Sequence, residues 1–210
     1  NCDLFDGILV MGDMIQTPGV LDHIEKMLSD NAKCPVLFVD TETSAFPYIE
    51  LHHYKAIVKL TEHLIKDHGY KDIAMLTGKQ WHVHSTERLN GFLDTMKANG
   101  LTVADDRIFY GDFWHISGQN LANRFVKENM KLPEAFICAN DYMAIGLASR
   151  FEELGVHVPE DVAVVGEVMV SAVKSRVEVA CPVTARPLTK TSKSEGLILP
   201  CICKHLLKVK

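Results

Sequence analysis

Residues 133–166 read PEAFICANDYMAIGLASRFEELGVHVPEDVAVVG. The apolar run 136–139 ends at Asn140 and Asp141, and either of these side chains can cap a helix. A second apolar run, 162–165, has the length of a fully buried strand. Between the runs, apolar residues recur at helical spacing until Gly155 ends the pattern: Met143, Ala144, Leu147, Ala148, Phe151 and Leu154. Strand, helix and strand in this order predict a βαβ unit.

The carboxyl ends of the two predicted strands are the expected ligand edge of this unit, because open α/β sheets bind ligands there. Asn140 and Asp141 follow the first strand. Only one of them is needed as a helix cap, which leaves the other for a ligand. An amide offers one donor and one acceptor to a pair of sugar hydroxyls, so we favour Asn140 as the ligand contact. Asp141 is then the helix cap or an acid on the wall of the site.

The same alternation of short apolar runs and amphipathic segments extends along most of the chain. We expect strands at 7–11, 36–39, 73–76, 107–110, 135–138 and 162–165. We expect helices at 18–28, 54–67, 85–99, 117–129 and 142–154, and a last one at 192–207 that Pro200 would break. Repeated β-then-α order predicts an α/β fold with parallel sheets covered on both faces.

Composition excludes several classes of function. The 210 residues have a net charge of −5 and no basic run, so this segment by itself is a poor nucleic-acid binder. No apolar stretch approaches the roughly 18 residues that span a bilayer, and the first residues do not resemble a signal peptide. The six cysteines show no disulfide-like framework, so we expect reduced thiols and a cytoplasmic protein.

Several blocks in a fixed order resemble one family. The block A-N-D-x-M-A-x-G at 139–146 and the block G-V-x-V-P-E-D-V-A-V-V-G at 155–166 are similar to the effector-binding core of LacI/GalR-type transcriptional regulators, a core related to periplasmic sugar-binding proteins. E-R-L-N-G-F at 87–92, Y-G-D-F at 110–113, D-G-I-L-V at 6–10 and P-V-L-F-V-D at 35–40 resemble further blocks of the same family.

The resemblance implies two Rossmann-like lobes with the ligand between them. The first lobe would take residues 1–68 plus 190–210, and the second residues 69–189. Family members begin the first lobe with βα units that have no counterpart here, so we expect this lobe to be incomplete at its N-terminus. After Gly166 the family continues with aromatic and acidic residues, whereas this chain continues with Glu167, Val168 and Met169.

Arg88 is the strongest single candidate for ligand binding. It is predicted in the first turn of a helix, where a cation is unfavourable unless another group holds it. A ligand rich in hydroxyls or carrying a carboxylate would do so. The alternative is an exposed arginine paired with Glu87 or Asp94. The resemblance favours ligand contact.

Phe113 and Trp114 are candidates for stacking on the ligand, because aromatic faces pack on sugar rings and planar bases. The alternative is packing in the core beneath the loop, and we expect one of the two to point inward. The resemblance selects Phe113 as the contact, with Trp114 as a second candidate. It also implies an acidic contact after Gly166, for which Glu167 is the candidate unless the register differs there, and it places His53 near the ligand.

Metal binding and catalysis find little support. His82 and His84 are separated by one residue, but the neighbouring sequence does not complete a metal site, so we expect loop-exposed histidines and no metal. The sequence contains no nucleophile elbow, Walker loop, dinucleotide fingerprint or metalloprotease helix. We therefore expect no enzyme and no cofactor.

The sequence thus predicts a sensor domain that binds a small polar molecule, a sugar or a nucleoside, and signals by closure of its lobes. By resemblance, DNA binding would reside in a module outside these residues, and the protein would be a homodimer that does not contact membranes. Two alternatives remain: a sensor fused to a signalling enzyme such as a diguanylate cyclase, and an extracytoplasmic solute-binding protein.

Overall fold

The computed structural model describes residues 4–15 and 17–167 and divides them into two compact units, one ending at His52 and the other beginning at His53. The sequence prediction placed this boundary after residue 68. In the structure the helix α2 (His53–Lys66) instead packs against α3 (Val83–Ala98), with the backbone of Tyr54 lying directly against Gly91.

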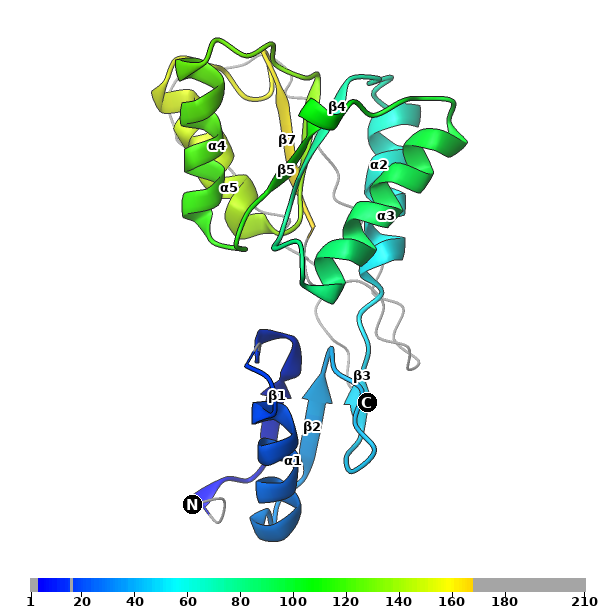
Figure 1. Ribbon diagram of the computed structural model, residues 1–210, viewed down its shortest axis with the longest axis vertical. Helices are drawn as coiled ribbons and strands as arrows, with labels where there is room; N and C mark the ends of the chain where they lie inside the picture. The colour runs from blue at the N-terminus through cyan, green and yellow to red at the C-terminus, as the bar shows by residue number, and fades with distance from the viewer. Residues whose placement is uncertain (1–3, 16, 168–210) are drawn as a thin grey trace, which may run out of the picture. The chain divides into compact units, whose positions relative to one another are not determined.

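The first unit is a small parallel sheet with one helix (Figure 1). Its elements are β1 (Ile8–Met11), the 3-10 helix η2 (Gly12–Met14), α1 (Val20–Asn31), β2 (Val36–Val39) and β3 (Tyr48–Ile49). The strand order is β1-β2-β3, and the two-residue β3 was not expected from the sequence. Four buried side chains form the core of this unit: Val10, Leu28, Val36 and Phe38.

The second unit is a four-stranded parallel sheet with helices on both faces (Figure 1). After α2 come β4 (Ile73–Thr77), α3, the 3-10 helix η3 (Asp105–Arg107), β5 (Ile108–Tyr110), α4 (His115–Lys127), β6 (Ala135–Cys138), α5 (Asp141–Glu153) and β7 (Ala163–Gly166). The strand order is β5-β4-β6-β7, with every pairing parallel. The predicted α/β class and the predicted parallel sheets are confirmed.

Strand β4 shows why its sequence is apolar throughout. Ala74 and Leu76 belong to the core under α4 and α5, whereas Ile73 and Met75 belong to the core under α2 and α3. Successive side chains of a strand point to opposite faces, so a sheet covered on both sides needs apolar residues at every position. This arrangement explains why the short uninterrupted apolar runs predicted strands correctly.

Helices α4 and α5 approach each other closely through glycines. A Cβ atom on Gly146 would lie 2.0 Å from the backbone oxygen of His115, and one on Gly118 would lie 2.2 Å from that of Met143. Only a residue without a side chain allows this contact. The two helices that begin at the carboxyl edge of the sheet are therefore held together at backbone distance.

The remaining sequence predictions concern cysteines, membranes and the C-terminal segment. Cys34 and Cys138 are free thiols, and burial raises the pKa of the Cys138 thiol above its ordinary value. Among the described residues, none of the helices is both long and apolar enough to cross a lipid bilayer. The predicted helix at 192–207 lies outside the described residues.

Candidate functional site

The carboxyl edge of the β5-β4-β6-β7 sheet gathers the predicted site residues of the second unit. Arg88 comes from α3, which follows β4. Phe113 and Trp114 follow β5, Asn140 follows β6, and Glu167 follows β7. Since all four strands are parallel, these loops emerge at the same edge.

Arg88, Glu167 and His53 form a buried cluster. The Arg88 Nε–H donates to Glu167 Oε2, and the exposed fractions of these side chains are 5% and 4%. Glu167 Oε1 lies 3.0 Å from His53 Nδ1, and the His53 residue is 2% exposed. A guanidinium and a carboxylate this deeply buried stabilise each other only as a pair, because each alone would lack solvation. The structure thus brings together three residues that are far apart in sequence.

The predicted place of Arg88 in the first turn of its helix is wrong, the alternative of an exposed arginine paired with Glu87 or Asp94 does not hold, and the favoured ligand contact stays a prediction. The helix α3 begins at Val83, so Arg88 lies in its second turn. Its partner is neither Glu87 nor Asp94. Glu87 Oε2 lies 2.8 Å from His84 Nδ1, and Asp94 accepts a hydrogen bond from Tyr54.

The Nδ1 atom of His53 has two competing neighbours. Besides Glu167, Arg88 Nη2 lies 2.7 Å from it. A carboxylate only accepts hydrogen bonds and a guanidinium only donates them, so one ring nitrogen cannot satisfy both contacts in the same tautomer. In a neutral ring the Nδ1 atom therefore makes only one of these two hydrogen bonds at a time, and the three side chains form one buried polar cluster.

Phe113 covers this cluster. Its ring centroid lies 5.8 Å from Arg88 Cζ, and its ring lies 5.3 Å from that of His82, edge to face. The residue has a φ of 71°, and its ring packs where a Cβ on Gly78 would be, 2.1 Å from the nearest ring atom. A positive φ is unfavourable for a bulky residue, so the surrounding contacts must hold Phe113 in place.

Asn140, not Asp141, caps the helix after β6. Its Oδ1 accepts a hydrogen bond from the backbone N–H of Met143 at 2.9 Å, and its Nδ2 donates to the backbone oxygen of Phe113 at 2.9 Å. Both ends of the amide are therefore engaged within the protein. Of the two roles expected for Asp141, that of helix cap is wrong and that of an acid on the wall of the site stays a prediction, as does the ligand contact of Asn140.

Asp141 is half-buried beside the cluster. Burial raises the pKa of its carboxyl group, and the negative charge of Glu167 raises it further. Among the described residues no hydrogen bond to this side chain is formed. Asp141 therefore offers acceptor oxygens to a ligand that carries hydrogen-bond donors.

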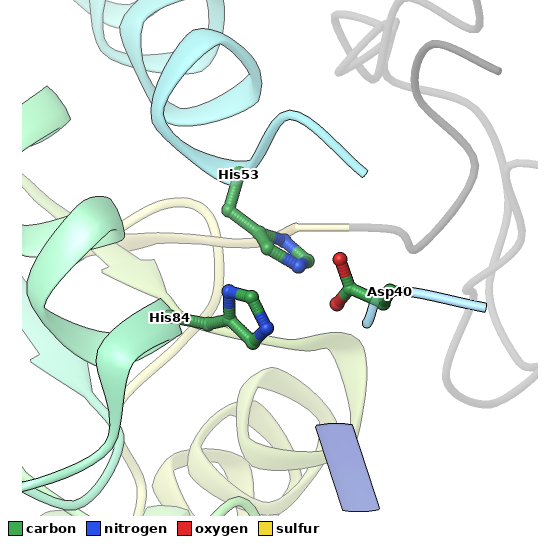
Figure 2. A group of neighbouring side chains, drawn as sticks. All are labelled: Asp40, His53 and His84. Carbon is green, nitrogen blue, oxygen red and sulfur yellow. The ribbon is translucent and has the colours of Figure 1, made fainter. Parts of the chain in front are cut away.

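The aromatic and imidazole side chains at this edge divide into buried and exposed ones. Trp114 is 57% exposed and its ring lies edge-on to that of Tyr142, so Phe113 is the one that packs against the core. His82 is buried and His84 is partly buried, which corrects the expectation of loop-exposed histidines. Figure 2 shows His53 and His84 with their rings side by side, and the ring centroids are 4.7 Å apart.

Sequence reasoning missed the histidines because nothing local distinguishes a buried imidazole from an exposed one. The available signal was their place between the carboxyl end of a strand and the following helix, where parallel α/β sheets collect ligand-facing residues. His82 contacts Phe113, and the backbone oxygen of His84 accepts a hydrogen bond from Arg88 Nη1 at 3.3 Å.

A parallel α/β unit with polar and aromatic side chains at the carboxyl edge of its sheet defines a class of small-molecule-binding domain. Residues 61–188 match the family model described as a periplasmic binding protein-like domain. The chain belongs to this family, and its sequence and fold are those of the effector-binding domain of LacI/GalR-type regulators.

One curated relative is the HTH-type transcriptional repressor PurR of Pasteurella multocida, which is 32% identical over 163 residues. That match covers 77% of this chain and 47% of the relative, so the chain spans about half the length of the protein it matches.

Two solved structures show the same fold. A sugar-binding LacI-family regulator from Escherichia coli, complexed with phosphate, has a TM-score of 0.58 and 26% identity over 78% of this chain and 58% of its own. The regulator CelR in complex with cellobiose has a TM-score of 0.58 and 28% identity over 77% of this chain and 48% of its own.

Proposed function

We propose that this domain binds a small polar effector, a sugar or a nucleoside-like molecule, at the carboxyl edge of the β5-β4-β6-β7 sheet, and releases it unchanged. The observation that carries the proposal is the buried Arg88–Glu167 pair beneath Phe113. The names of two structural neighbours, a sugar-binding regulator and a cellobiose complex, support the same class of ligand.

The chemistry of these side chains suits a molecule with vicinal hydroxyl groups. Arg88 supplies donors in a planar fork, while Glu167 and Asp141 supply acceptors. A hydroxyl both donates and accepts, so a pair of hydroxyls can replace part of the contact between Arg88 and Glu167 without leaving either charge unpaired. The face of Phe113 adds an apolar surface for a sugar ring or a base.

The family resemblance supplies the rest of the proposal. Closure of the two lobes on the effector would shift a conformational equilibrium, because contacts from both lobes are complete only in the closed state. The shift would be passed to a DNA-binding module outside these residues, in a cytoplasmic homodimer. The repressor names of the curated relatives support a regulator in which this domain has no catalytic role.

A thermal-shift assay with cellobiose, glucose, adenosine and guanosine tests the proposal. A ligand at one hundred times its Kd adds about 2.7 kcal/mol of stability, which raises the Tm by roughly 5–10 °C for a domain of this size. Chromatography of the recovered ligand should show no product.

The Arg88→Ala variant should abolish the ligand-dependent shift. Arg124→Ala is the matched control, because Arg124 lies at the same 5.8 Å from an aromatic ring but is exposed and pairs with Glu128. Its shift should equal that of the parent. An Arg88→Ala variant that keeps the full shift, or a ligand that is converted to product, would overturn the proposal.

A further inference from the structure

Two histidines, the partly buried His63 and the exposed His68, meet at the C-terminal end of α2, on the part of the second unit not used by the effector site. His63 lies in the last turn of α2, and His68 follows the end of the helix. Their rings are perpendicular, with centroids 4.8 Å apart, and the two Nε2 atoms are 3.2 Å apart.

The turn after α2 holds His68 in this position. Gly69 has a φ of 74°, which lets the chain reverse immediately after the helix. The backbone N–H of Gly69 donates to Ile65 and that of Tyr70 to Leu64, both at 3.1 Å. The ring of Tyr70 then stacks on that of His68, with 5.5 Å between centroids. The imidazole pair is thus built by the backbone and by ring packing.

A carboxylate orients the ring of His63. Its Nδ1 atom lies 2.5 Å from Asp67 Oδ2. A carboxylate only accepts hydrogen bonds, so His63 donates from Nδ1, and in the neutral tautomer that makes this contact its Nε2 atom is an acceptor. A neutral imidazole can carry its proton on either nitrogen, so the Nε2 atom of His68 is also an acceptor in the tautomer with the proton on Nδ1. In these tautomers both Nε2 atoms can act as metal ligands.

The separation of the two nitrogens matches that of two ligands on one metal ion. Imidazole nitrogens bind zinc at about 2.0–2.1 Å in tetrahedral geometry, which places two of them about 3.3 Å apart. The imidazole–carboxylate contact of His63 is the usual outer support of a metal-bound histidine. The C-terminal end of a helix also carries partial negative charge, which favours a cation. The nearby Lys66 is neutralised by Glu62 at 2.6 Å.

We propose that His63 and His68 form a binding site for a divalent first-row transition metal ion, with Asp67 as the residue that positions His63. The two imidazoles fill two coordination positions, and water fills the others because the site is exposed. Imidazole ligands select Cu²⁺, Ni²⁺ and Zn²⁺ over Mg²⁺ and Ca²⁺, with Cu²⁺ the tightest. The proposal is independent of the effector site and of its ligand.

Isothermal titration of the tag-free chain with NiCl₂ tests the site. The parent should bind one equivalent, and His63→Ala and His68→Ala should each weaken that binding about tenfold or more, since loss of an outer-shell partner alone costs about 10–100-fold. Asp67→Asn should bind more weakly than the parent but more tightly than either alanine variant. MgCl₂ should give no saturable binding.

His157→Ala is the matched control, because His157 is also an exposed imidazole beside a carboxylate, Glu152, at 3.4 Å. It should bind Ni²⁺ like the parent. Circular dichroism should show all variants folded, since none of them changes a fully buried side chain. A parent chain that binds no Ni²⁺, or alanine variants at His63 and His68 that bind as tightly as the parent, would overturn the proposal.

Discussion

Replacing Glu167 by Gln removes one charge from the buried cluster while keeping the size of the side chain. Arg88 would then be a cation with 5% of its side chain exposed and no counter-charge in the pair. Breaking a buried ion pair by removing one partner costs about 3–5 kcal/mol. We therefore expect Glu167→Gln to lower the free energy of unfolding by about 3 kcal/mol or more at neutral pH.

One effect opposes this loss. The charge of Glu167 is the second cause of the raised pKa of Asp141, after burial. Its removal should lower the pKa of Asp141 and relieve a repulsion. Asp141 is partly solvated, so this relief is screened and smaller than the loss from the unpaired Arg88. The net change remains destabilising.

Urea unfolding of the parent, Glu167→Gln, Arg88→Met and the double variant measures the effect. Because the two residues form one pair, the double variant should lose less stability than the sum of the single losses. Glu128→Gln is the control. Glu128 pairs with Arg124 on the surface, with 53% of each side chain exposed, and should change stability by less than about 1 kcal/mol. A Glu167→Gln variant within about 0.5 kcal/mol of the parent would refute the buried pair, because surface substitutions give changes of that size.

Three further changes test other features of the second unit. Gly146→Ala should destabilise by about 1–3 kcal/mol in urea, because its Cβ would lie 2.0 Å from the backbone oxygen of His115; the gain of about 1 kcal/mol normal for alanine in a helix would contradict the close packing. Asn140→Ala should lose about 1 kcal/mol through the helix cap, and an unchanged midpoint in urea would count against that role. The pKa of Asp141 in the folded state lies above its ordinary 3.8. Its protonated carboxyl group therefore contributes fully to the stability of the folded state below pH 3.8, and this contribution is lost as pH rises through the raised pKa. Asp141→Asn should therefore gain stability relative to the parent as pH increases above about 4, and a difference that stays constant with pH would exclude the effect.

The strands were predicted well because a strand that is buried on both faces appears in the sequence as an uninterrupted apolar run. The runs at 36–39 and 135–138 coincide with β2 and β6. Strand β3 has only two residues and no apolar run of its own, so no pattern could have indicated it. Helix starts were less well predicted. α3 begins at Val83 without a side-chain cap, and the expected start two residues later misplaced Arg88 by a turn.

The candidate site could be located but not assembled from the sequence. Its residues follow strands, and strand ends are readable from periodicity. The partner of Arg88 was not readable, since Glu167 is 79 positions away and the acids near Arg88 in sequence have other partners. Which of Asn140 and Asp141 caps the helix could not be predicted from the sequence either. Both can cap a helix, and the start of α5 at Asp141, with Asn140 extended before it, decides that Asn140 is the cap.

Asn140 connects the loop that carries the Phe113 ring to helix α5. Its side-chain oxygen accepts a hydrogen bond from the backbone N–H of Met143 in the first turn of α5, and its side-chain nitrogen donates one to the backbone carbonyl of Phe113. Phe113 is thereby connected to α5, which packs against α4 with the two backbones in direct contact. The position of the Phe113 ring beside Arg88 therefore depends on the packing of α5 against α4 as well as on the loop after β5.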